Sequence, residues 1–280
     1  MVAYHGVPDV DPFSAQIDWL CDHTSIVSPE QFRRHLLEGE PLGDHPVLLT
    51  FDDGDRTVLD VAALVLGERG IPAVAFVVAG LVDTDQPFWW VEVEELVRAG
   101  AVTDRSSGEL VRHLKTVPDL ERRSVLQGLR DQVGDVVRTP QLTSDELVKL
   151  ELGGVSIGNH SMSHPCLDSC DDPTLVHEVE ESHRLLTEML GHPPVAFAYP
   201  NGNHDSRVRS VVEACGYDMA FAFDHRMLGP AGDPLAVSRV RVDSWANLDR
   251  FKILVSGLHP RLHELRSGRW DRHAHERRRS

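Results

Sequence analysis

Two neighbouring carboxylates offer the first candidate chemistry in this chain. Asp52 and Asp53 follow the apolar run 47–51 and precede Gly54. Adjacent side chains on an extended strand point to opposite sides, and this geometry relaxes where a strand passes into a loop. One carboxylate could then bind a metal ion while its neighbour faces a substrate. Taken alone, the motif is explained equally well by a solvated acidic turn that caps the following helix.

Two histidines four residues apart are the second candidate. His160 and His164 follow the apolar run 154–158. On a helix, this spacing would turn both imidazoles to one side, where they could chelate one ion. The chain has 16 histidines, so a chance pair is the alternative. Two histidines and a carboxylate form an open metal site with room for water and substrate. The sequence therefore predicts a metal site of His160, His164 and one of the two adjacent carboxylates, Asp52 or Asp53.

Apolar runs that alternate with helical patterns supply the elements that would position both motifs. The runs 47–51 and 73–78 flank the amphipathic segment 57–69, and this order of strand, helix and strand indicates a parallel βαβ unit. Further helices are predicted at 145–152, 173–190 and 205–215, and further strands at 154–158, 195–198 and 219–223. The sequence thus predicts an α/β barrel or a doubly wound sheet, whose active site lies at the C-terminal ends of the strands.

Two segments depart from this alternation. The stretch 103–140 is polar, is helical in places and has no clear strand, so we expect a helical segment inserted between two barrel units. Residues 266–280 are rich in Arg and His, and we expect them to form a frayed basic tail. The remainder, 1–265, is expected to be one domain.

Composition limits the partners and the compartment. The net charge of −16 disfavours binding to phosphate backbones, so nucleic acid is not an expected partner. The N-terminus lacks the pattern of a signal peptide, and no apolar stretch approaches the about 18 residues that span a membrane. The chain as written is therefore expected to be cytoplasmic. The four cysteines are interpreted as free thiols, and the sequence makes no prediction of oligomeric state.

A third motif follows the predicted strand 195–198. In Tyr199-Pro-Asn-Gly202, a tight turn could present a backbone N–H group, as an oxyanion hole requires. An ordinary Pro-Asn-Gly turn is the alternative reading of this motif alone.

Together, the three motifs resemble those of the polysaccharide deacetylases, the NodB-homology family (carbohydrate esterase family four). The first family motif, Thr-Phe-Asp-Asp-Gly, is intact at 50–54, and the second is present as His160, Ser161 and His164. The third, Arg-x-Pro-Tyr/Phe-Gly, is matched only in part by 198–202. The resemblance extends over roughly residues 1–255.

The resemblance implies a distorted (β/α) barrel with about seven strands that removes acetyl groups from N-acetylated glycans. It implies that Asp52 is the catalytic base, that Asp53, His160 and His164 bind the metal, and that the Asn201 N–H stabilises the oxyanion. One divalent ion is expected as cofactor. Zn²⁺ is the first expectation, because two histidines and a carboxylate suit it, and Co²⁺, Ni²⁺ or Fe²⁺ would also fit.

Two departures from the family pattern leave roles to be filled. Ala198 stands where the third motif has the arginine that orients the catalytic carboxylate, and Arg239 or Arg241 could replace it. Tyr199 and Asn201 occupy the next positions of this motif and are expected near the oxyanion or the substrate.

The general acid is the second role to be filled. The family takes it from a late Leu-x-His motif, which His259 fits only superficially because 251–265 has helical spacing. We predict His5 instead, because a similar N-terminal Tyr-His strand occurs in a circularly permuted branch of the family. Asp243 is expected to be the carboxylate that supports this acid.

Aromatic residues and two competing functions complete the analysis. Trp89 and Trp90 could stack on sugar rings or pack beneath the helical segment. An amidase acting on a small non-sugar amide would use the same metal site. A metal-containing carbohydrate-binding protein without catalysis is the other alternative. The intact Asp52–Asp53 pair argues against this alternative, whereas Ala198 argues weakly for it.

Overall fold

A parallel sheet of seven strands forms the centre of the molecule. The computed structural model describes residues 1–134, 138–224 and 233–256. The strand order is β8-β7-β6-β5-β4-β1-β9. The strands are β1 (Val2–Tyr4), β4 (Leu49–Phe51), β5 (Ala73–Val77), β6 (Val155–Asn159), β7 (Phe197–Ala198), β8 (Ala220–Phe221) and β9 (Val240–Arg241).

The segment 237–242 joins the two edges of this sheet. At the β8 edge, the Val237 N–H donates to the Ala220 carbonyl, and the Val237 carbonyl accepts from the Ala222 N–H, each at 2.9 Å. Val240 and Val242 donate to Met1 and Ala3 at the β1 edge, at 2.9 and 3.0 Å. Because one segment binds both edges, the sheet curls into a distorted barrel, which confirms the predicted fold class. The first strand of the chain thereby lies between β4 and β9.

The central strands are buried on both faces. In β5, Val74 and Phe76 pack with Ala198 and Phe221 in one apolar cluster, whereas the alternate residues pack with the helices in another. This two-sided burial explains why the run 73–78 is continuously apolar.

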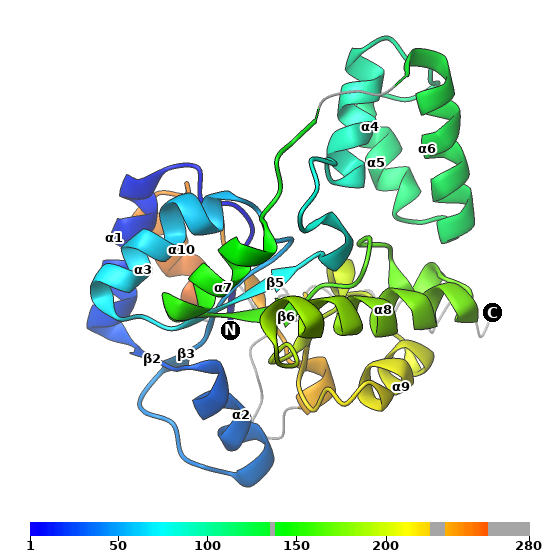
Figure 1. Cartoon of the computed structure of the whole chain (residues 1–280). Helices are drawn as coiled ribbons and strands as arrows, with labels where there is room; N and C mark the ends of the chain where they lie inside the picture. The colour runs from blue at the N-terminus through cyan, green and yellow to red at the C-terminus, as the bar shows by residue number, and fades with distance from the viewer. Residues whose placement is uncertain (135–137, 225–232, 257–280) are drawn as a thin grey trace, which may run out of the picture.

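Helices surround the barrel (Figure 1). They are α1 (Val10–His23), α2 (Pro29–Glu38), α3 (Ala63–Arg69), α7 (Ser144–Leu152), α8 (Asp172–Leu190), α9 (Ser206–Ala214) and α10 (Leu248–Val255). A π-helical turn, Val58–Ala62, precedes α3 within the helix predicted at 57–69. Two short strands, β2 (Ser25–Ile26) and β3 (Pro46–Val47), pair separately. Within the part of the chain that the structure describes, no helix is both long and apolar enough to cross a bilayer.

Three helices between β5 and β6 form a unit that projects from the barrel, and we call them the helical unit (Figure 1). They are α4 (Trp89–Arg98), α5 (Ser107–Leu114) and α6 (Asp119–Val133). The unit has its own apolar core, in which Val93 and Leu96 of α4 pack with residues of α5 and α6. It therefore begins at Trp89, before the predicted range 103–140, because α4 packs with the other two helices. His259 and the tail 266–280 lie outside the described residues.

Candidate active site

The two predicted motifs meet because three neighbouring strands end at the same edge. β4 ends at Phe51 and β6 at Asn159, with β5 between them. The end of β5 is bonded to both following loops, since Val78 donates to the Asp53 carbonyl at 3.4 Å and His160 donates to Val77 at 2.9 Å. Parallel strands thus deliver both motifs to their common C-terminal edge.

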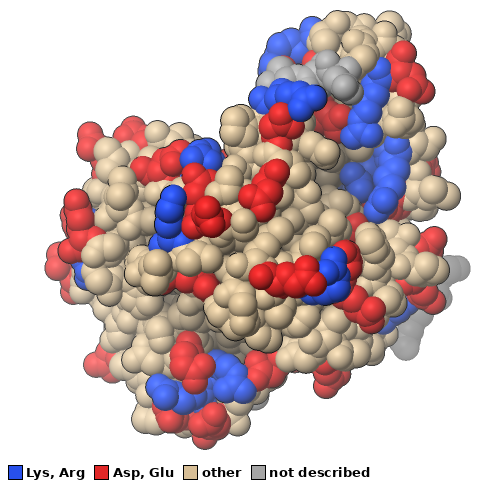
Figure 2. Space-filling view, viewed as in Figure 1, with Lys and Arg blue, Asp and Glu red and all other residues tan. Residues whose placement is uncertain are grey.

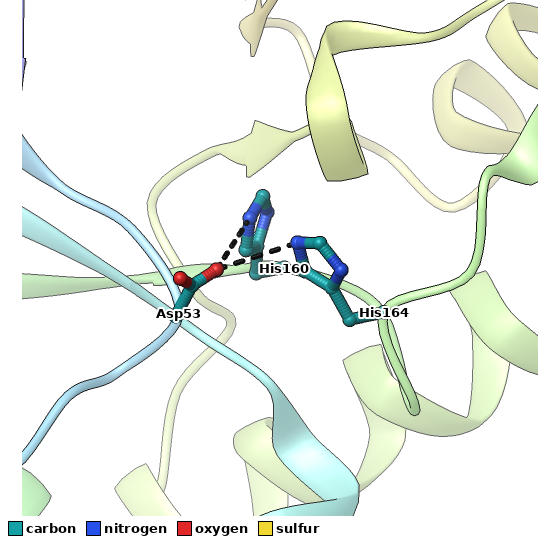
Figure 3. A group of neighbouring side chains, drawn as sticks. All are labelled: Asp53, His160 and His164. Atoms are coloured by element: carbon teal, nitrogen blue, oxygen red, sulfur yellow. Dashed lines mark ion pairs between the residues drawn. The ribbon is translucent and has the colours of Figure 1, made fainter. Parts of the chain in front are cut away.

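Asp53, His160 and His164 form a compact group of possible metal ligands (Figure 3). The Asp53 Oδ1 lies 3.5 Å from the His160 Nε2 and 3.3 Å from the His164 Nε2. The three ligand atoms all lie within 4.8 Å of one another, and both histidines are buried. Three convergent donors of these types can hold one divalent ion.

The histidines come from a loop, not from the helical turn that their spacing would also allow. Residues 160–164 contain no helix, and Ser161 and His164 have φ angles of 67° and 58°. Left-handed backbone is costly for such residues, so the surroundings must hold it. The Asn159 side chain accepts from the Ser161 N–H at 2.8 Å, and the Ser161 Oγ accepts from the His164 N–H at 3.1 Å.

Glu178 of α8 holds the remainder of this loop, and the sequence analysis did not identify it. Its buried carboxylate accepts from the backbone N–H groups of Met162 and Ser163, at 3.0 and 2.8 Å, and from the Ser163 hydroxyl at 2.6 Å. Arg123 of the helical unit reaches the same carboxylate at 3.3 Å. The loop that carries both histidines is thus tied to the barrel and to the helical unit.

Hydrogen bonding and burial favour the metal-binding form of both histidines. The Nδ1 of His160 lies 2.7 Å from the Ala198 carbonyl, and donation to it leaves the Nε2 lone pair toward Asp53. Burial lowers the pKa of His164 below its ordinary value, in spite of the Asp53 carboxylate beside it. A neutral ring is the form that binds a metal. The donors therefore fit a divalent ion.

A sharp turn separates the two carboxylates. Asp53 and Gly54 have φ angles of 73° and 79°. A Cβ atom on Gly54 would lie 3.1 Å from a methyl group of Val77, so glycine serves both the positive φ and the close approach. The turn lets Asp53 face the histidines while Asp52 faces Arg239.

Asp52 forms a buried bidentate ion pair with Arg239. The guanidinium donates to Oδ1 at 2.6 Å and to Oδ2 at 2.8 Å. It also donates to the Ala222 carbonyl at 3.0 Å and to the Thr50 hydroxyl at 3.1 Å. Burial alone would raise the pKa of the Asp52 carboxyl, but the charge of Arg239 reverses this and holds that pKa below its ordinary value. Asp52 is therefore ionised at neutral pH.

The barrel encloses Arg239 among aromatic rings beside Asp52. Arg239 is fully buried, and its guanidinium lies over the rings of Phe76, Phe221 and Phe223, at 5.3 to 5.7 Å from their centroids. Of the two arginines weighed from the sequence, Arg239 contacts Asp52. Arg241 pairs instead with Asp243 at 3.4 Å.

A cavity of about 280 Å³ at this edge brings most of the predicted site residues together. It is lined by His5, Asp52, Asp53, Trp90, Lys115, His164, Asn201, Phe223 and Arg241. The ring of His5, which follows β1, stands edge-on to Phe223 at 5.6 Å. Asp243 forms its ion pairs with Arg241 and Arg250, so the expectation that it supports His5 is not met by these contacts.

Tyr199 does not line this cavity, which differs from its expected place near the oxyanion or the substrate. Trp89 does not line it either and packs with the helical unit, which is the alternative that the sequence left open for it. Tyr199 is fully buried, and its hydroxyl donates to the Leu235 carbonyl at 2.8 Å. The indole of Trp89 is buried beneath Arg122 and donates to the His164 carbonyl at 3.0 Å. Both side chains pack under the loops of the site.

Asn201 occupies a strained turn that the helical unit contacts. Its φ angle is 56°, and a Cβ atom on the following Gly202 would lie 2.5 Å from the Phe223 nitrogen. The Asn201 side-chain oxygen accepts from the Lys115 Nζ at 2.7 Å. Burial lowers the pKa of Lys115, although Cys166 and Asp53 oppose this.

Lys115 and Phe223 line the cavity although sequence reasoning did not identify either as a site residue. Lys115 is the charged one of the two. It is one of three lysines in the chain, and this rarity is the signal that could have drawn attention to it. Its position at the end of α5, in a segment without a motif, gave no indication that it reaches the site.

A curled parallel barrel with a buried, ionised carboxylate beside an Asp–His–His group has the parts of a hydrolase active site. Residues 39–220 match the family model for polysaccharide deacetylases. The chain therefore belongs to the polysaccharide deacetylase family, whose reaction is hydrolysis of acetyl groups. His5 lies outside the matched residues. No protein in the curated set shows significant sequence similarity to this chain.

Solved structures share the fold over almost the whole chain. The Streptococcus pyogenes deacetylase PplD, in complex with acetate, is 18% identical, with a TM-score of 0.66 over 92% of this chain and 97% of that one. IcaB from Ammonifex degensii is 20% identical, with a TM-score of 0.63 over 91% and 94%. The de-N-acetylase from Aggregatibacter actinomycetemcomitans is 18% identical, with a TM-score of 0.64 over 90% and 98%.

Proposed function

We propose that this protein is a metal-dependent N-deacetylase that acts on an amino sugar of a poly- or oligosaccharide and releases acetate. The observation that carries the proposal is the cavity in which the ionised Asp52, paired with Arg239, lies beside Asp53 and His164. A general base next to a metal site is the arrangement that amide hydrolysis requires.

Asp53, His160 and His164 would hold one divalent ion, with Zn²⁺ favoured and Co²⁺, Ni²⁺ or Fe²⁺ as alternatives. When bound, such an ion polarises the acetyl carbonyl and lowers the pKa of the attacking water. The Ala198 carbonyl holds the ring of His160 in the tautomer that leaves Nε2 available.

Asp52 acts as the general base. Both of its oxygens accept from Arg239, and each keeps a second lone pair for the proton of the attacking water. Arg239 thereby orients the carboxylate and keeps it ionised, which is the role of the family arginine that Ala198 replaces.

Asn201 and His5 complete the chemistry from opposite parts of the chain. The Asn201 N–H donates to the oxyanion that forms when water attacks. His5, in its protonated form, donates to the nitrogen of the leaving amine. Trp90, whose ring lies 4.7 Å from that of His164, offers a face to the sugar ring.

Acetate release from N-acetylated oligosaccharides, measured before and after chelation and metal replacement, tests the proposal. Release that chelation abolishes and metal restores supports it. Release only from small non-sugar amides would identify an amidase instead. Binding of the oligosaccharides without release would identify a carbohydrate-binding protein without catalysis.

A further inference from the structure

The loop 160–164, which carries both metal-site histidines, is called the histidine loop. A second cavity, of about 520 Å³, lies between this loop and the helical unit, and we call it the helical groove. Its walls include Phe88 and Trp90 at the start of α4, Leu120 and Gln127 of α6, and Ser163 and His164 of the histidine loop. Its volume falls in the range of about 300–1,000 Å³ that is typical of sites for small organic ligands.

The helical groove adjoins the catalytic cavity. Trp90 and His164 line both spaces, and their rings are 4.7 Å apart. A substrate that extends beyond the catalytic cavity on the side of Trp90 and His164 would meet the groove next. This adjacency favours an extension of the substrate itself as the occupant.

The walls of the groove combine a flat aromatic face with hydrogen-bonding groups. The rings of Phe88 and Trp90 are stacked, 4.9 Å apart and 9° from parallel, and both are only half-buried. Leu120 is 78% exposed and adds an apolar surface, while Gln127 adds an amide. A pyranose has a matching pair of features, an apolar C–H face and a rim of hydroxyl groups.

The basic side chains of the groove are already paired, which argues against an anionic occupant. Figure 2 shows basic side chains gathered where the helical unit faces α8. Arg122 and Arg123 of this region both pair with Asp119, at 2.6 and 2.5 Å. Arg130 pairs with Glu92 at 2.6 Å. With its charges compensated, the groove suits a neutral polar ligand better than a phosphate.

We propose that the helical groove binds the neutral sugar units next to the acetylated sugar that reacts, so that the helical unit selects for chain length. This inference rests on the proposed deacetylase function. It assigns to the helical unit a binding role that the barrel chemistry does not require.

Rates on substrates of increasing length test the proposal. The probes are N-acetylglucosamine and its β-1,4- and β-1,6-linked oligomers of two to six units, assayed for acetate with the metal-loaded protein. For the wild type, kcat/KM is expected to rise with length. Leu120→Glu places a charge on the apolar wall, and Phe88→Ala removes half of the aromatic stack. Each is expected to lower the hexamer-to-monomer ratio of kcat/KM at least about fivefold, as truncation of a binding hot spot does.

Leu152→Glu is the matched control, because Leu152 of α7 is 85% exposed and does not line the groove. Its hexamer-to-monomer ratio should equal that of the wild type. A wild-type rate that does not depend on length, or an equal ratio in all four proteins, would overturn the role of the groove while leaving the deacetylase function intact. No acetate from any probe, in spite of full metal occupancy, would instead overturn the proposed function on which the inference rests.

Discussion

The barrel edge and the helical unit each bring a charge to the catalytic cavity, and they hold it differently. In the barrel, Asp52 is fixed by a bidentate pair with Arg239, which is itself enclosed by three phenylalanine rings. In the helical unit, Lys115 is held by the neutral side chain of Asn201. Asp52, the proposed general base, needs one geometry, and several contacts fix its ion pair. Lys115 has a neutral partner, from which a substrate could displace it. The predictions on His160, His5 and the Asp52–Arg239 pair test the barrel, and the prediction on Lys115 tests the helical unit.

The largest effect is expected from His160→Ala. Loss of one of three ligands should remove the metal and, with it, activity above background. Elemental analysis of the purified variant measures metal per chain, and circular dichroism checks that the barrel is folded. Full metal occupancy in this variant would show that the ligand set is wrong.

Asp52→Asn should keep the metal and lower kcat by about 10²–10⁴-fold, the usual contribution of a general base. The amide is nearly isosteric with the carboxylate but cannot take the proton from water. Steady-state acetate release and metal analysis of the same sample provide the test. Near-normal turnover would remove Asp52 from the mechanism.

His5→Ala should lower kcat by about 10²-fold and abolish the basic limb of the pH–rate profile, because the leaving amine loses its proton donor. His259→Ala, the alternative weighed from the sequence, should do neither. The reverse pattern in the two profiles would assign the general acid to the other end of the chain.

Arg239→Met should destabilise the fold, because it leaves the Asp52 carboxylate buried without its partner. Breaking a buried ion pair in this way costs about 3–5 kcal/mol of the free energy of unfolding. Urea denaturation of the metal-free protein measures the loss. The double variant with Asp52→Asn should recover part of the stability. A double variant as unstable as the single one would show that the charge of Asp52 is not the cause.

The ion pair of Asp52 and Arg239 should also make the stability of the fold depend on pH, in a direction that follows from the lowered pKa of Asp52. Because the pKa of Asp52 is lower in the folded chain than its ordinary value of 3.8, ionised Asp52 contributes stability above pH 3.8. This contribution is lost as the pH falls from 3.8 through the lower, folded-state pKa. The stability of the wild type should therefore fall more steeply in that range than that of Asp52→Asn.

Lys115→Met should have the smallest effect, a fall in kcat of about tenfold, which corresponds to one hydrogen bond made by a charged group. The variant frees the Asn201 turn without touching the metal ligands, so metal content should not change. Lys149→Met is the control, since Lys149 is exposed on α7. An unchanged kcat for Lys115→Met would show that catalysis does not depend on the contact between the helical unit and the Asn201 turn.

Much of the site could be predicted from the sequence, because its motifs are local and each follows a recognisable strand. The apolar runs before Asp52 and His160 indicated strands, and parallel strands bring their C-terminal ends to one edge. The spacing of the histidines, in contrast, suggested a helical turn, and the structure has a loop with left-handed residues at Ser161 and His164. Hydrogen bonds that the loop donates to Glu178 of α8 hold it, and local spacing contains no information about them.

Only the tertiary structure decided which partners the motif residues have. The sequence offered Arg239 or Arg241 as the replacement for the missing arginine, and the curl of the barrel at 237–242 brought Arg239 to Asp52. Lys115 reaches Asn201 across 86 positions of the chain, because the end of α5 lies beside the catalytic cavity. Strand periodicity is set by neighbouring residues, so it can be read along the chain. The contacts of Arg239 with Asp52 and of Lys115 with Asn201 depend instead on how the sheet closes and where the helical unit docks. Both are properties of the packed core as a whole.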